Sequence, residues 1–202
     1  MSGFYEEING ICRLKIPFDK IYTSVFLIEQ YETPILIDCA TTSEDVDKYI
    51  VPSLKAYGYE FSDIGVLILT HRHRDHAGGM DQVLSLAPNI KVVKKIGRIF
   101  DRLFMYPMSG HTKNCVGVLD ERSHTLICGD GLQGAGVDRF RCHVEDVDAY
   151  QETIDRIKND NRIENLLFSH AYEPWNVDRM VGREHVNQCL SLCKKYVSGG
   201  IK

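Results

Sequence analysis

The chain has 202 residues, of which 44% are hydrophobic and 26% are charged, and it carries a formal net charge of −4 with a pI near 6.1. This composition is ordinary for a folded globular protein, and the acidic balance gives no support for nucleic-acid binding, which usually needs a basic face. No apolar run is long enough to span a bilayer, and the first residues do not resemble a secretory signal. We therefore expect a cytoplasmic protein that binds neither membrane nor nucleic acid.

The first forty residues carry β-rich runs separated by turn-like residues. The predicted strands span 11–15, 22–29 and 34–38. Thr42 is typical of a helix cap followed by an acidic first turn, which predicts a helix towards Tyr57. Pro52 within this helix predicts a kink or a late start.

The rest of the chain alternates short apolar runs with segments of helical spacing. The run 64–69 is nearly all apolar, as expected for a strand that is covered on both faces. Further predicted elements are a helix at 80–86, a hairpin of 115–119 with 125–128, a helix at 146–158, a strand at 165–169 and a helix at 182–197. Strands interspersed with helices indicate a sheet core covered by helices.

The cysteines are odd in number and form no CxxC pair, which argues against a disulfide framework and against a cysteine zinc site. We expect reduced thiols, several of them in apolar strands. They are Cys12, Cys39, Cys115, Cys128, Cys142, Cys189 and Cys193.

The strongest chemical signal follows the apolar run directly, as His71-Arg72-His73-Arg74-Asp75-His76. Imidazole and carboxylate are the ligands that suit zinc, iron or manganese. On an irregular turn, His71 and His73 can point to one side while Asp75 and His76 reach another. One loop can therefore supply ligands to two metal ions.

These residues resemble the HxHxDH signature of the metallo-β-lactamase superfamily, and three further motifs follow in that family's order. The four segments are 70–79, similar to THxHxDHxGG, then Ser109–Thr112, Cys128–Asp130 and Leu166–His170. The resemblance implies an α/β (α+β) fold, a four-layer αβ/βα sandwich, in a single domain over residues 1–202.

The resemblance also implies two divalent ions, with zinc foremost and iron or manganese as alternatives. Two ions that share a water lower its pKa towards about 7 or below and so supply hydroxide at neutral pH. Asp75 is the candidate to position this nucleophile and to pass its proton to the leaving group. Carried over by motif, one ion is held by His71, His73 and His111, the other by Asp75, His76 and His170, and Asp130 bridges both.

Within the superfamily, the bridging Asp130 and the expected location disfavour a true β-lactamase. The segment 129–140 loosely resembles the GDxLFxxGxGR segment of glyoxalase II, through Gly136, Arg139 and Phe140, although Gln133 replaces its aromatic residue. The residues after His170 do not supply the helical domain with which glyoxalase II binds glutathione, which leaves glutathione recognition open.

The expected activity is therefore hydrolysis of a small-molecule ester, thioester or lactone, as in the glyoxalase II-like and lactonase-like branch. Three alternatives stay open: a phosphodiesterase or nuclease, an iron-dependent oxidoreductase or sulfur dioxygenase on the same fold, and a non-catalytic metal-binding or partner-binding protein.

Fewer residues separate His73 from His111 than is usual in this family, so we expect the segment 92–108 to lack the usual helix and hairpin. Its side chains would then lie near the metal ions, although core packing is favoured for the apolar ones. They are Arg98, Asp101, Arg102, Phe104, Met105 and Tyr106. The pocket is expected to be shallow or to be completed by a partner subunit in a homodimer. Tyr172 and Trp175 are candidates for a substrate wall, whereas the three histidines outside the motifs are expected to be solvated or structural. These are His124, His143 and His185.

Overall fold

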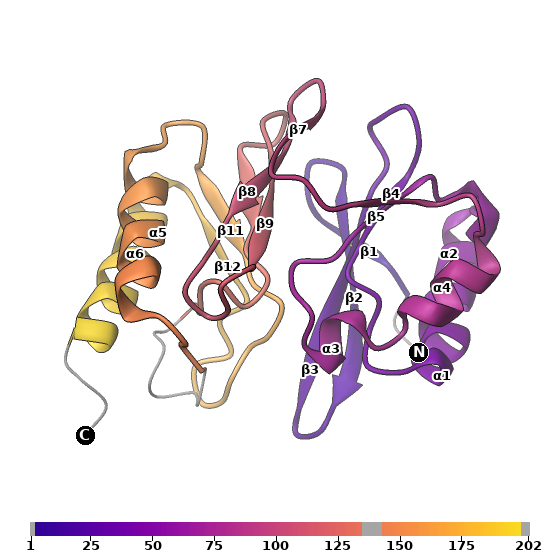
Figure 1. Ribbon diagram of the computed structural model, residues 1–202, viewed down its shortest axis with the longest axis horizontal. Helices are drawn as coiled ribbons and strands as arrows, with labels where there is room; N and C mark the ends of the chain where they lie inside the picture. Colours follow the sequence, from indigo (N-terminus) through magenta and orange to yellow (C-terminus); the bar gives the residue numbers. More distant parts are fainter. Residues whose placement is uncertain (1–2, 135–142, 199–202) are drawn as a thin grey trace. The chain divides into compact units, whose positions relative to one another are not determined.

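The computed structural model describes residues 3–134 and 143–198, and the chain divides into two units, Met1–Lys95 and Ile96–Lys202. Each unit contains one six-stranded sheet, shown with its helices in Figure 1. Whether the units make up the single domain expected over residues 1–202 stays a prediction. Among the described residues, no helix is both long and apolar enough to cross a membrane.

The sheet of the first unit has the strand order β1-β2-β3-β4-β5-β6, antiparallel from β1 to β4 and parallel from β4 to β6. Its strands are β1 (Tyr5–Ile8), β2 (Ile11–Phe18), β3 (Ile21–Ile28), β4 (Ile35–Ile37), β5 (Val66–Ile68) and β6 (Lys91–Val93). Its helices are α1 (Ser43–Asp45), the π-helix η1 (Val46–Ile50), α2 (Val51–Tyr57), the 3₁₀ helix η2 (Phe61–Asp63), α3 (Arg74–Ala77) and α4 (Met80–Leu86).

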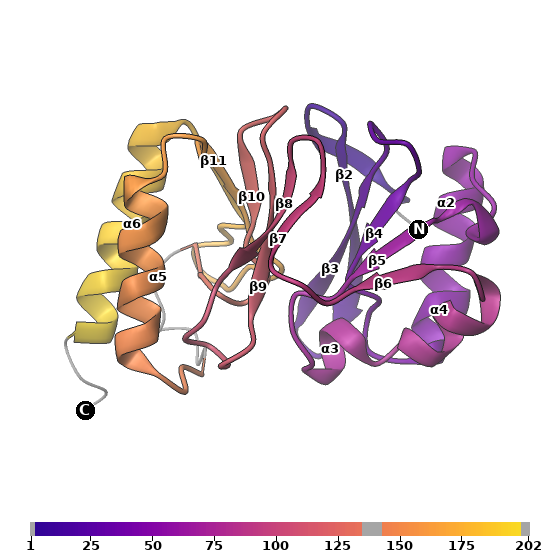
Figure 2. The ribbon, with the colours of Figure 1, turned by 45° about the horizontal axis from the view of Figure 1, so that its top comes forward.

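Helices α1, α2 and α4 lie on one face of this sheet (Figures 1 and 2). The core between them consists of alternate residues of the strands and the apolar stripe of the helices. This follows from the side-chain period of about 2 residues in a strand and about 3.6 in a helix. Its buried members include Leu14, Leu27, Leu36, Leu67, Val46, Ile50, Leu54 and Val83. Pro52 lies in the first turn of α2, directly after the π-helix η1. The helical segment already begins at Ser43, capped by Thr42, and continues through η1 into α2, so the late start expected at Pro52 is wrong. The kink stays a prediction.

The sheet of the second unit has the order β12-β11-β10-β9-β8-β7, with β10 and β11 parallel and the other neighbours antiparallel. Its elements are β7 (Gly97–Phe100), β8 (Leu103–Pro107), β9 (Val116–Asp120), β10 (Thr125–Ile127), α5 (Val147–Asn159), β11 (Asn165–Leu167), β12 (Arg179–Val181) and α6 (Arg183–Ser198). Helices α5 and α6 pack side by side on one face of this sheet (Figure 2). The core beneath them includes Leu119, Leu126, Leu166, Phe168, Tyr150, Ile154, Val186 and Leu190.

One expectation about this unit is wrong, because the segment 92–108 does contain a hairpin, formed by β7 and β8. Its turn is stabilised locally. Arg102 adopts a φ of +66°, the Arg98 guanidinium donates to Asp101 over 3.2 Å, and it also lies 4.7 Å above the Phe104 ring.

The other predicted strands and helices are found within a few residues of their expected bounds. The six cysteines in the described part of the chain are buried and form no disulfide, as expected. Cys142 lies outside the described residues, and so do Gly136, Arg139 and Phe140 of the glyoxalase-like segment.

Candidate metal centre

In the first unit, the loop that follows β5 gathers the histidines of the HxHxDH motif. The His71 ring lies 4.6 Å from the His73 ring and 4.1 Å from the His76 ring, measured between centroids. His73 directly precedes α3 with extended backbone, and Asp75 and His76 lie in that short helix. His76 Nε2 and Asp75 Oδ2 are 3.4 Å apart. This loop therefore presents its four ligand-type side chains together.

Two glycines allow this loop to lie directly on the segment that follows β4. A Cβ on Gly78 would come within 1.9 Å of the Thr41 carbonyl oxygen, and one on Gly79 within 2.1 Å of the Cys39 carbonyl oxygen. Neither contact is tolerable, so the glycines of the motif are required by close backbone approach. Thr23 on β3 adds a hydrogen bond from its hydroxyl to the Asp75 carbonyl (3.0 Å).

Asp38, which did not emerge from the sequence, lies buried beneath this loop at the end of β4. His76 donates from Nδ1 to Asp38 Oδ2 over 2.7 Å. Thr70 donates its hydroxyl to the same oxygen (2.8 Å) and its backbone N–H to Oδ1 (2.7 Å). Because the Thr70 hydroxyl proton is committed to Asp38, its oxygen accepts from His71 Nδ1 over 3.2 Å. The signal for Asp38 in the sequence is a carboxylate that ends an all-apolar strand.

This network fixes which nitrogen of two histidines carries the proton. With Nδ1 donating in both His71 and His76, the lone pair of each neutral ring lies on Nε2, where a metal can bind. A carboxylate behind a metal-binding imidazole also increases its strength as a ligand.

In the second unit, His111 is held by the chain just before α5. It donates from Nδ1 to the His143 carbonyl over 2.5 Å, which again leaves the lone pair on Nε2. The Asp146 N–H donates to the Gly110 carbonyl (3.1 Å). Gly110 has a φ of +137°, and a Cβ there would lie 2.5 Å from the Tyr150 Cβ. The glycine therefore brings His111 close against α5.

Asp130 and His170 are the other two candidate ligands of the second unit. Each follows the end of one of the parallel strands β10 and β11. Asp130 Oδ1 lies 3.2 Å from His170 Nε2, and its other oxygen, Oδ2, lies 3.6 Å from His111 Nε2. All three residues are buried. The Asp130 carboxylate therefore faces a different histidine with each oxygen.

These separations fit the donor spacing around a metal ion. Two atoms bound at about 2.1 Å to one tetrahedral or octahedral ion lie about 3.0–3.6 Å from each other. The three histidine–aspartate separations are 3.2, 3.4 and 3.6 Å. A ring nitrogen of His71 and a ring nitrogen of His73 also lie within 4.8 Å of each other. The nitrogen and oxygen donors of each unit therefore suit a divalent cation such as zinc.

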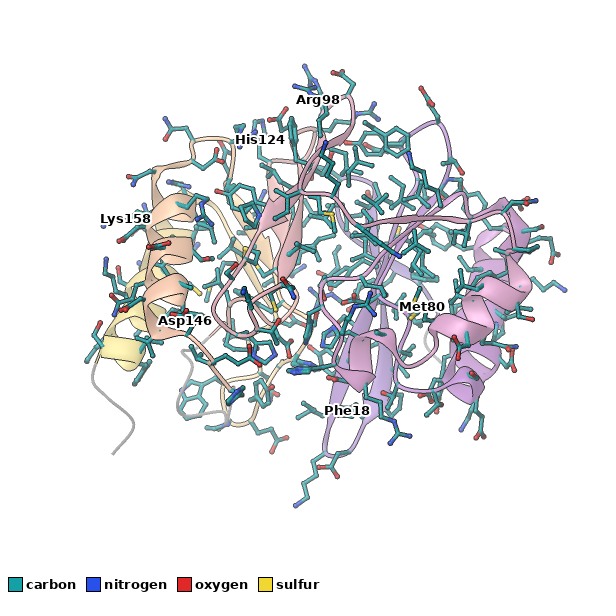
Figure 3. All side chains as sticks on the ribbon, viewed as in Figure 1. Phe18, Met80, Arg98, His124, Asp146 and Lys158 are labelled. Carbon is teal, nitrogen blue, oxygen red and sulfur yellow. The ribbon has the colours of Figure 1, made fainter. Side chains whose placement is uncertain are left out.

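The side chains of the 92–108 segment that were expected beside the metal lie elsewhere. Strand β8 pairs its first residue, Leu103, with Asp120 and its last, Pro107, with Val116, so that the hairpin turn lies at the far end of β8 from the loop of His111. Figure 3 shows Arg98 and His124 at one end of this unit and Asp146 at the other. This places Arg98, Asp101, Arg102 and Phe104 away from His111, which corrects the expectation. Met105 and Tyr106 are buried, as core packing requires.

The three histidines outside the motifs have structural or exposed positions, as expected. His124 has a φ of +54° and contacts the Arg162 carbonyl through Nδ1 (3.1 Å). His185 contacts the Val181 carbonyl in the same way (2.8 Å). The His143 side chain is exposed, and its carbonyl holds His111.

Comparison with known proteins bears on the family. A family model described as the anti-Pycsar protein Apyc1 matches residues 16–96. The chain is 31% identical over 160 residues to a hydroxyacylglutathione hydrolase of Pseudomonas fluorescens (strain SBW25), which covers 65% of this chain and 59% of that protein. The chain spans 51–59% of the length of the curated relatives of this kind.

Solved structures match over nearly the whole chain. A metallo-β-lactamase from Pontibacter korlensis superposes with a TM-score of 0.75 at 14% identity, over 98% of this chain and 99% of that one. A metallo-β-lactamase from Pseudomonas aeruginosa in its mono-zinc form gives 0.73 at 14% identity, over 96% and 95%. At such identities the likeness shows the fold. The chain has the metallo-β-lactamase fold, and the resemblance to that superfamily inferred from the motifs is confirmed.

Proposed function

We propose that the protein is a metal-dependent hydrolase that acts on a small-molecule ester, thioester or lactone at a centre holding two divalent ions. Zinc is the first candidate, with iron and manganese as alternatives. The ligands would be His71, His73 and His111 for one ion and Asp75, His76 and His170 for the other, with Asp130 shared between them.

The observation that carries this proposal is the placement of Asp130 between two histidines. Its oxygens lie 3.2 Å from His170 Nε2 and 3.6 Å from His111 Nε2. A carboxylate that served a single ion would direct one oxygen, or both, to the same ligand set. Separate oxygens facing separate imidazoles favour a carboxylate that bridges two ions.

The protonation of the histidines supports the same reading. In His71, His76 and His111, Nδ1 is bound to an oxygen within the same unit, and Nε2 is left as the donor atom. Three histidines oriented in this way, two of them by one network in the first unit and one in the second unit, are typical of metal sites, in which a second partner orients each imidazole. Histidines in a solvated polar loop would not require such hydrogen-bond partners.

When bound, the ions would lower the pKa of a shared water and polarise the oxygen of the scissile group. Asp75 is partly exposed, with 13% of its side-chain surface accessible, whereas His76 beside it is fully buried. Its carboxylate can therefore orient the attacking water, accept a proton at an oxygen and return that proton to the leaving group. No side-chain nucleophile is required.

Two observations support a small-molecule substrate. The curated relatives are named for hydrolysis of hydroxyacylglutathione, an acyl conjugate of a small thiol. The net charge of −4 disfavours a polyanionic substrate such as nucleic acid. The proposal includes a cytoplasmic location.

The test is a hydrolysis panel of thioesters, lactones, lactams and phosphodiesters on protein of known metal content. Oxygen consumption with persulfides as substrates is a further assay. We expect turnover of at least one ester, thioester or lactone, its loss with a chelator and its return with metal. The variant Asp75→Asn should lose at least about 100-fold in kcat, whereas Asp47→Asn on the exposed part of η1 should not change it. Activity confined to phosphodiesters or to persulfides would overturn the proposed substrate class. A fully metal-loaded protein with no turnover in any of these assays would overturn the enzyme assignment.

A further inference from the structure

The residues between β11 and β12 form a loop that is closed at its base. Leu167 pairs with Arg179 at the end of the two strands, and the Phe168 N–H donates to the Asp178 carbonyl over 3.0 Å. His170 lies in the first limb of this loop. Any residue at the tip of this loop therefore lies within a few residues of a proposed metal ligand.

A tight turn shapes the tip of the loop. The backbone N–H groups of Trp175 and Asn176 both donate to the Tyr172 carbonyl, over 3.1 and 2.8 Å, and Asn176 has a φ of +47°. The Tyr172 ring lies 6.1 Å from the His170 ring. The turn therefore holds Trp175 close to the residue that contacts the imidazole of His170.

The second limb of the loop rests on the segment that follows Asp130. A Cβ on Gly134 would lie 2.6 Å from the Val177 carbonyl oxygen and 2.7 Å from Val177 Cγ1, so the two backbones are in direct contact there. Asp130 and His170 are 3.2 Å apart at their donor atoms. The loop is thus fixed at its base, at His170 and at Val177, which leaves the tip little freedom.

Trp175 is exposed in this rigid setting, with 43% of its surface accessible. Six large hydrophobic side chains are exposed in the described part of the chain, and Trp175 is the one of them that lies in a loop carrying a proposed ligand. Trp175 therefore offers an accessible aromatic surface in the same loop as a proposed metal ligand, where a substrate group can pack on it.

The charge of the loop limits what that ligand can be. Residues 168–178 include Glu173 and Asp178 and no lysine or arginine. A carboxylate on the substrate would meet repulsion here, whereas an uncharged apolar or aromatic group would gain the contact area of the indole.

We propose that Trp175 is a specificity-determining residue that receives an uncharged apolar or aromatic acyl group of the substrate. This inference rests on the proposed hydrolase function and narrows its substrate class to neutral acyl compounds with a bulky apolar end. The indole face packs on that end while the scissile carbonyl reaches the centre formed by Asp130 and His170.

The kinetic test compares two thioesters of one neutral thiol, phenylacetyl and acetyl, on the full metal-loaded chain. In Trp175→Ala, kcat/KM for the phenylacetyl compound should fall about tenfold or more, while that for the acetyl compound should change less than twofold. Trp175→Phe should retain most of the activity on both. Leu192→Ala, which removes a similarly exposed apolar side chain from α6, is the matched control and should change neither.

A binding test does not depend on turnover, because Trp175 is the single tryptophan of the chain. Titration of the zinc-loaded protein with the phenylacetyl amide analogue should change the tryptophan emission saturably, and the acetyl amide should not. An unchanged emission with the phenylacetyl amide, or an equal loss on both thioesters in Trp175→Ala, would overturn the inference. Turnover that persists with either result would leave the hydrolase proposal standing. Absence of turnover together with a saturable emission change would overturn the hydrolase and retain the binding role of Trp175.

Discussion

Replacing Asp38 by asparagine should weaken metal binding while the chain still folds. The asparagine would keep the size of the side chain and the oxygen that accepts the Thr70 N–H, but an amide NH₂ would replace the oxygen that accepts from His76 Nδ1 over 2.7 Å. Since that amide group only donates, Nδ1 must become an acceptor and the imidazole proton must move to Nε2. Nε2 is the atom that faces Asp75 Oδ2 at 3.4 Å, and a protonated Nε2 cannot bind a metal.

The size of the effect follows from the buried position of Asp38. Loss of the oriented partner of a metal-binding histidine typically costs 10–100-fold in metal affinity, or about 1.4–2.7 kcal/mol. Metal-free protein should lose less, about 1–2 kcal/mol of unfolding free energy, because a neutral hydrogen bond replaces a charged one at the same place.

The assay is a zinc titration of metal-free protein in competition with a chromophoric chelator. Asp47→Asn is the matched control, since the Asp47 carboxylate accepts from Gln82 over 2.6 Å at an exposed site, and its affinity should match the wild type. Wild-type zinc affinity in Asp38→Asn would refute the reasoning, because the proton on His76 would then not depend on Asp38.

Three further changes have definite outcomes. Gly110→Ala should lower the free energy of unfolding by at least about 2 kcal/mol, because its Cβ would lie 2.5 Å from that of Tyr150. Gly97→Ala is the control, since Gly97 has a similar φ (+121°) but open space around the added Cβ. Equal losses of the two variants in urea unfolding would contradict the clash. Hydrogen bonds from the arginine two residues later lower the pKa of Asp160, so its charge stabilises the fold above the unfolded pKa of about 4 and stops doing so as the pH falls through the lower folded pKa. Asp160→Asn should therefore lower the free energy of unfolding by up to about 1 kcal/mol at pH 7 and by progressively less as the pH falls below about 4, and a difference that does not change with pH would contradict this. Burial raises the pKa of the Cys39 thiol to about 12, so iodoacetamide should modify Cys39 in urea but not in native protein at about pH 8, and mass spectrometry showing native alkylation would be the opposite result.

Elements with a strong local signal could be predicted from the sequence alone. The apolar run 64–69 predicts a strand covered on both faces, and β5 is buried throughout. Thr42 predicts the start of a helix because its own hydroxyl accepts from the Asp45 N–H three residues later. The cluster at 71–76 could be recognised because its ligand types are concentrated within one loop. In each case the determining interactions lie within a few residues of each other.

The features that the sequence did not predict depend on contacts between distant residues. Asp38 acts on Thr70 and His76, which lie 32 and 38 positions along the chain. The carbonyl that orients His111 belongs to His143, 32 residues away, and a backbone oxygen leaves no mark in a sequence. The β7–β8 hairpin turns at Arg102 with a φ of +66°, a conformation that arginine does not favour and that the sequence therefore does not predict.

The central claim is the proposal that the seven ligands named above bind one pair of ions, and anomalous diffraction from crystals grown with zinc tests it most directly. We predict two zinc peaks about 3.5–4 Å apart, with Asp130 bound to both. A single peak held by the 71–76 loop alone, or His111, Asp130 and His170 turned away from the zinc, would contradict the claim.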